Sequence, residues 1–91
     1  MSNSQKLKYD LEERTSKFGE SIIEFVKKLS RNSITQRLIP QLIGAGTAIG
    51  SNYCEADCAE SNKDFIHKMA IANKESKESK FFLRMMSRAC V

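Results

Sequence analysis

Apolar residues recur along the chain at alternating intervals of four and three residues, in three separate stretches. This spacing places them on one face of an α-helix, because the helix completes a turn every ~3.6 residues. No stretch alternates apolar and polar residues with the two-residue period of a β-strand. The pattern therefore predicts an all-α fold in which long helices pack along apolar seams, as in a coiled coil.

Each seam defines one expected helix, over residues 11–30, 34–58 and 62–87. The first seam comprises Leu11, Thr15, Phe18, Ile22, Phe25 and Leu29, the second Leu38, Leu42, Ala45, Ile49, Asn52 and Ala56, and the third Phe65, Met69, Ala72, Ser76, Ser79, Leu83 and Met86. The short connections favour antiparallel neighbours. The length suits one domain, so we expect a single up-down antiparallel helical bundle over residues 1–91.

Each expected helix is preceded by a possible capping pair, in which a cap residue is followed three positions later by an acid or an amide. The pairs are Asp10 with Glu13, Ser33 with Gln36, and Ser61 with Asp64. Pro40 lies early in the second helix and removes one backbone donor there. It predicts a kink or a late helix start.

Two features look like ligand sites but favour structural roles. Residues 44–50 (GAGTAIG) lack the Gly-Lys-Ser/Thr ending of a phosphate-binding loop, and no strand precedes them. Gly46 and Gly50 are four apart and instead predict that another helix approaches closely. Cys54 and Cys58 have the same spacing, but no second ligand pair accompanies them. We therefore expect no metal site and no cofactor.

Composition narrows the setting of the protein. The net charge of +4 permits a polyanionic partner without requiring one. No apolar run resembles a signal peptide or a membrane span, so we expect a cytoplasmic protein with no membrane partner and with reduced cysteines. One His and scattered Ser provide no nucleophile with an adjacent base. We therefore expect neither an enzyme nor a small-molecule substrate.

A polar cluster is expected between the second and third helices. A second line on the third helix comprises Ile71, Glu75, Glu78, Phe82 and Met85. Its two acids are flanked by apolar residues and should be partly buried, so they need donors. Asn52 can donate from the second helix, and Glu55 lies on the same face. The cluster is interpreted as a structural or interface feature. A catalytic acid pair is the other reading, but the Glu-x-x-His motifs of helical di-metal sites are missing, so no catalytic residue is assigned.

Basic residues form a further line on the third helix. The line comprises Lys63, His67, Lys74, Lys77, Arg84 and Arg88, with Phe81 among them. Its spacing places it on one face, roughly opposite the seam. Such a stripe can track a phosphate backbone, which makes its Lys and Arg members the candidate nucleic-acid-binding residues. The alternative is a solvated outer face laced by Glu–Lys pairs.

Five segments together resemble the bacterial four-helix-bundle proteins encoded by 23S rRNA intervening sequences. They are residues 10–15 (DLEERT), 41–43 (QLI), 46–56 (GTAIGSNYCEA), 60–68 (ESNKDFIHK) and 74–83 (KESKESKFFL). The resemblance covers residues 9–86. It implies an up-down bundle without enzymatic activity that assembles as a homopentamer. It also implies a link to the accessory variability determinant of diversity-generating retroelements, which works with a reverse transcriptase and nucleic acid.

Members of that family continue into a fourth helix, whereas this chain ends near the end of the third. We therefore expect an uncovered apolar stripe that a sister chain covers, unless the product is truncated. Two functions are open: an oligomer that contacts RNA or a ribonucleoprotein through its basic face, and a protein–protein interaction scaffold with no nucleic-acid role.

Overall fold

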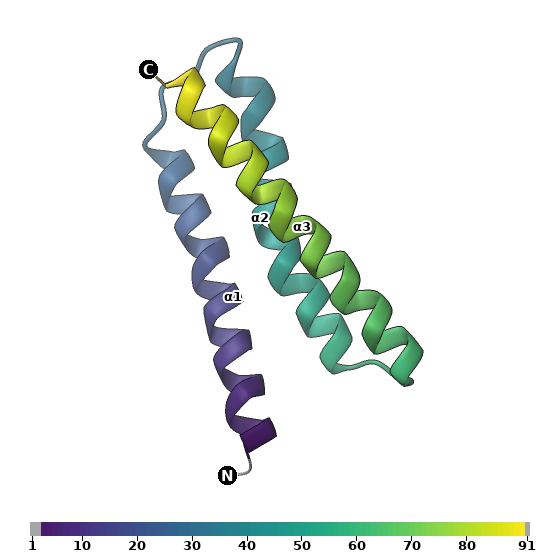
Figure 1. Cartoon of the computed structure of the whole chain (residues 1–91). Helices are drawn as coiled ribbons and strands as arrows, with labels where there is room; N and C mark the ends of the chain where they lie inside the picture. Colours follow the sequence, from purple (N-terminus) through teal and green to yellow (C-terminus); the bar gives the residue numbers. More distant parts are fainter. Residues whose placement is uncertain (1–2, 91) are drawn as a thin grey trace.

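The structure, a computed structural model, describes residues 3–90, with side chains from residue 10 onward. It contains three α-helices: α1 (Asn3–Lys27), α2 (Thr35–Asp57) and α3 (Asn62–Ala89). Consecutive helices run antiparallel (Figure 1), and residues 3–90 contain no strand. The prediction of an all-α antiparallel bundle is confirmed.

The start of α1 differs from the prediction. The helix begins at Asn3 rather than after Asp10, so Asp10 is not a cap. Its carboxylate instead lies 3.6 Å from the guanidinium of Arg14, one turn further along the same helix. Residues 3–9 contain neither Gly nor Pro, so nothing in their backbone preferences stops the helix at Asp10. At its other end α1 stops at Lys27, before the predicted residue 30.

The start of α2 uses a different pair from the predicted Ser33 and Gln36. Asn32 Oδ1 accepts hydrogen bonds from the backbone N–H groups of Ile34 and Thr35, at 2.9 and 3.0 Å. In return, the backbone N–H of Asn32 donates to Thr35 Oγ1 at 2.9 Å. This reciprocal pattern is that of a capping box, shifted by one residue. Thr35 is buried in the connection, where these bonds satisfy its hydroxyl.

The remaining helix boundaries lie close to the predicted ones. Ser61 caps α3 as predicted, because its side chain accepts from the backbone N–H of Asp64 at 3.1 Å. α3 then continues to Ala89, slightly past the predicted residue 87. α2 begins before Pro40 and includes it, so the expected late start is wrong.

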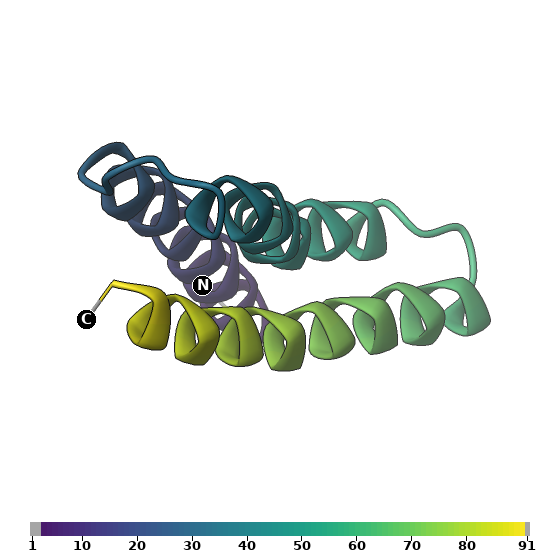
Figure 2. The same ribbon diagram turned by 90° about the horizontal axis from the view of Figure 1, so that it is seen from above.

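α2 is the central helix, and both α1 and α3 pack against it. α2 and α3 lie side by side (Figure 2), whereas α1 diverges from that pair toward its N-terminal end (Figure 1). The core lies at the opposite end, where all three helices meet. Its buried members are Ile22, Val26, Ile39, Leu42 and Met86. The molecule is correspondingly elongated, with extents of 46 × 25 × 16 Å.

Glycine permits the close packing of α1 on α2. A Cβ added at Gly46 would lie 2.9 Å from Ile22 Cγ1, closer than real side chains pack. Gly19 of α1 lies opposite, where an added Cβ would be 3.8 Å from the carbonyl oxygen of Gly46. The predicted packing role of Gly46 is therefore confirmed, with Ile22 as the residue that fills the space.

The backbones of α1 and α3 stay apart within residues 3–90 and leave a groove along α2. The groove is lined by Leu11, Arg14, Thr15, Phe18, Ile49 and Ser76. Two residues assigned to the apolar seams, Phe25 and Phe65, remain 39% and 44% exposed. The seams are therefore only partly buried by the described residues. None of the helices described is long and apolar enough to cross a bilayer.

Candidate nucleic-acid interface

The candidate site is the outward face of α3, on the side away from α2. The buried residues of this helix are Ala72, Ser79 and Met86. Since successive residues are rotated by about 100°, positions three and four apart stay on one face. The predicted basic residues all lie on the opposite face and are all exposed: Lys63, Lys74, Lys77, Arg84 and Arg88. The spacing in the sequence was therefore sufficient to place them.

Charge is distributed unevenly among the helices. α3 contains seven of the fifteen Lys and Arg residues of the chain but only three of the eleven acids. Its excess of four positive charges is as large as the net charge of the whole chain, +4. By contrast, α1 pairs its cations locally: Arg14 with Asp10, Lys17 with Glu13 and Lys27 with Glu24. The positive potential of the protein is therefore concentrated on α3.

The five candidate cations are available to a ligand. Within residues 10–90 the α3 cation that forms an ion pair is Lys68, whose Nζ lies 3.1 Å from Glu55 Oε2 on α2. Lys68 belongs to the side of α3 that packs on α2. The outward cations have no such partner among the described residues, so the Glu–Lys pairs expected for a solvated outer face are not found at these positions.

A shallow hollow lies in the middle of the outward face. It is lined by Ala70, Asn73, Lys74, Lys77, Glu78 and Phe81. Phe81 is 53% exposed, and its ring contacts the ring of Phe82 edge-on, with centroids 5.3 Å apart. An apolar ring, an amide, two ammonium groups and the carboxylate of Glu78 are thus presented together. Asn73 was not among the predicted site residues, although its spacing from Lys77 and Phe81 would have placed it on their face.

The predicted polar cluster forms different contacts from those expected. The side-chain amide of Asn52 donates to the carbonyl oxygen of Ala48 in its own helix at 2.8 Å. Glu55 pairs with Lys68 rather than joining Asn52. Glu75 and Glu78 are half-buried on α3, as their apolar neighbours predicted. Among residues 10–90 no hydrogen bond links either acid to Asn52, so the expected donor role of Asn52 is wrong.

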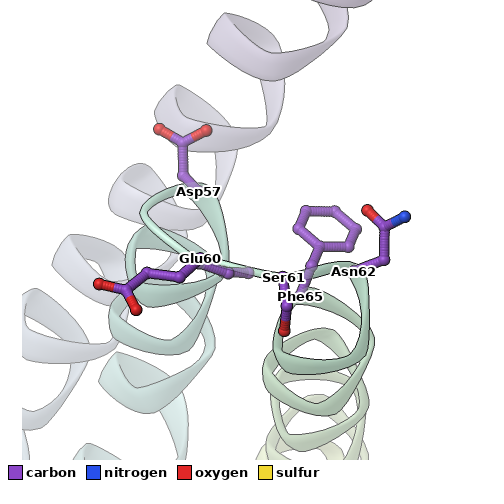
Figure 3. Close-up of a pocket in the computed structure, with 7 residues that line it drawn as sticks. Asp57, Glu60, Ser61, Asn62 and Phe65 are labelled. Carbon is purple, nitrogen blue, oxygen red and sulfur yellow. The ribbon is translucent and has the colours of Figure 1, made fainter.

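A second hollow lies at the α2–α3 connection. Asp57, Glu60, Ser61, Asn62 and Phe65 line it, with Ala56 and Ala59. Figure 3 shows the carboxylates of Asp57 and Glu60 pointing in different directions. Residues 10–90 contain no group of three or more His, Cys, Asp or Glu side chains that could hold a metal ion. The negative charge of this hollow is unsuited to a polyanion.

Cys54, Cys58 and Cys90 are free thiols, all exposed. Cys54 lies on α2, whereas Cys58 and Cys90 directly follow the ends of α2 and α3. The thiols therefore lie at the surface, on elements outside the basic face.

The fold and the site define a class of small helical-bundle protein with one strongly basic helix face. The 23S rRNA-intervening sequence protein family matches residues 8–90, and this chain belongs to that family. A solved structure from Bacteroides thetaiotaomicron, a protein of unknown function from the S23 ribosomal protein family, has the same fold with a TM-score of 0.79. It is 30% identical, and the match covers 90% of this chain and 73% of that chain. No curated protein matches this chain.

Proposed function

We propose that this protein is a non-enzymatic, oligomeric helical bundle that contacts RNA or a ribonucleoprotein through the outward face of α3. The observation that carries the proposal is a row of five exposed cations on the face of α3 opposite its buried residues. Cations in such a row can replace the counterions along a phosphate backbone, which favours binding most strongly at low salt. The proposed activity needs no metal, cofactor or catalytic residue.

The family resemblance supports the same assignment by analogy of fold. The accessory variability determinant of diversity-generating retroelements resembles this bundle and works with nucleic acid. We propose that the two families are related and that nucleic-acid contact is a shared property. The basic face of α3 is the surface of this chain best suited to that role.

Self-association is the second part of the proposal. The groove between α1 and α3 presents Leu11, Phe18 and Ile49 to solvent, and exposed apolar surface of this kind is suited to contact with another protein surface. We propose that a second copy of the chain covers it, in a homopentamer as the resemblance implies. The same groove favours the alternative function, a protein–protein interaction scaffold with no nucleic-acid role.

One experiment tests both parts. Size-exclusion chromatography with light scattering gives the mass of the particle with and without a labelled RNA hairpin, at about 50 mM and about 200 mM salt. The expected result is a homo-oligomer that carries RNA at the lower salt concentration and releases it at the higher one. A particle that binds no RNA at either salt concentration would favour the alternative function, a protein–protein interaction scaffold.

The two matched variants each remove two positive charges, one from α3 and the other from α1. Lys74→Gln with Lys77→Gln alters the proposed face, whereas Lys17→Gln with Lys27→Gln alters exposed lysines of α1. The α3 pair should lower the slope of log affinity against log salt by about one to two. The α1 pair should leave the slope nearly unchanged. Equal effects of the two pairs would mean that net charge, rather than this face, binds the RNA.

A further inference from the structure

Phe81 is an apolar ring in the middle of the cationic row. Lys74 and Lys77 precede it by seven and four residues, and Arg84 and Arg88 follow it by three and seven. These spacings keep all five on one face and spread the cations about 10 Å to either side of the ring along the helix axis. Neither contact with water nor the binding of phosphate groups explains why an apolar ring is exposed at this position.

The ring of Phe81 is held by the fold rather than buried in it. Phe82, which is packed against the core cluster, contacts it edge-on with an interplanar angle of 68°. This contact leaves Phe81 53% exposed, so surface of the ring remains available for stacking. The ring of Phe81 therefore contacts a residue that packs on the core, while the ring itself faces solvent.

The hollow next to Phe81 has the groups that a nucleobase requires. Ala70 is small and leaves room, and Asn73 offers an amide NH2 donor group and a carbonyl acceptor. Glu78, the one acid of the lining, adds a carboxylate that can accept from the exocyclic amine of a base. Lys74 and Lys77 border the hollow and can neutralise the phosphates on either side of a base. Aromatic rings bind bases of any sequence because every base has a flat apolar face.

We infer that the α3 face binds unpaired RNA, with one base stacked on Phe81 and the adjoining phosphates on the lysines and arginines beside it. This inference rests on the proposed function and names its substrate class. In a duplex the bases are stacked and paired in the interior of the helix, where a ring on a rigid α-helix cannot reach them. Single strands, loops and bulges expose the faces of their bases.

Stacking and charge contribute separately to binding, so they can be measured separately. The probes are a labelled U-rich single strand and an RNA hairpin of equal length, titrated at low salt with the full chain. Phe81→Ala should weaken binding of the single strand about tenfold and leave its salt slope unchanged, because no cation is removed. Phe81→Tyr keeps the ring and should restore binding. Ile23→Ala, which shortens an exposed side chain on α1, is the control and should bind as the wild type does.

A spectroscopic readout tests the stacking itself. The chain has no Trp, so Phe81→Trp introduces a single indole whose emission should be quenched when a base stacks on it. Ile23→Trp reports on a site away from the face and should keep its emission. The inference is overturned if Phe81→Ala binds the single strand as tightly as wild type, or if RNA at saturation leaves the Phe81→Trp emission unchanged. In either case the proposed function still stands, provided that the wild type binds RNA. If the wild type binds neither probe, both the stacking inference and the proposed function are overturned.

Discussion

Met86 and Phe81 lie five residues apart on α3, yet Met86 is fully buried and Phe81 is 53% exposed. Met86 packs with Ile22, Leu42 and the rest of the core, whereas Phe81 lies among exposed cations on the outward face. The same helix therefore supplies one surface to the fold and another to solvent. Because the cations of the outward face are exposed, their substitution should leave the core largely intact.

The largest loss of stability is expected in the core. Leu42 is completely buried in the middle helix, so Leu42→Ala should lower the free energy of unfolding by about 2–5 kcal/mol, through lost burial and a residual cavity. The measurement is urea unfolding followed by circular dichroism at fixed protein concentration, since oligomer stability depends on concentration. Ile66→Ala is the control, because Ile66 is 66% exposed. Equal losses from both substitutions would contradict the assignment of the core.

A smaller effect is expected at the α1–α2 contact. Here the substitution of two glycines of α2 by Ala should change the stability in opposite directions. At Gly46 an added methyl meets Ile22 at 2.9 Å, so Gly46→Ala should cost about 1–3 kcal/mol. At Gly44 an added methyl meets nothing within 4 Å, so Gly44→Ala should stabilise α2 by up to about 1 kcal/mol. Thermal unfolding of both variants measures the difference. The same sign at both positions would show that α1 does not pack on Gly46.

The smallest effect on stability is expected on the outward face. Lys74→Gln combined with Lys77→Gln should change the free energy of unfolding by less than about 0.5 kcal/mol, because both side chains are exposed. The same variant should nevertheless weaken RNA binding at low salt. Urea unfolding of this variant beside wild type makes the comparison, and a loss above about 1 kcal/mol would mean that this face is part of the packing.

Helix boundaries were predictable where a single local interaction decides them. Ser61 caps α3 by accepting one hydrogen bond from the backbone N–H of Asp64, as the pattern of that pair predicted. Asp10 has the same pattern, but α1 is already helical at that point and uses the side chain for an ion pair with Arg14. A capping motif therefore identifies a possible start, and the residues before it decide whether the chain begins a helix there.

The candidate interface was predicted more accurately than the polar cluster. The outward cations needed only the periodicity of one helix, so Lys63 and Arg88 were placed correctly from spacing alone. The polar cluster required knowledge of how two helices are rotated against each other. Asn52 donates within its own helix, and Glu55 meets Lys68. The pairing of Glu55 with Lys68 joins two helices, so the spacing within one segment does not encode it.

By itself, the sequence determined that three long helices form and that α3 is apolar on one side and basic on the other. Both follow from the fixed angle between successive residues of a helix, which turns spacing into position on a face. Only the tertiary structure decided which part of each seam is covered and that Phe81 remains open beside Asn73. These outcomes depend on the rotation and separation of whole helices, which contacts between distant segments determine.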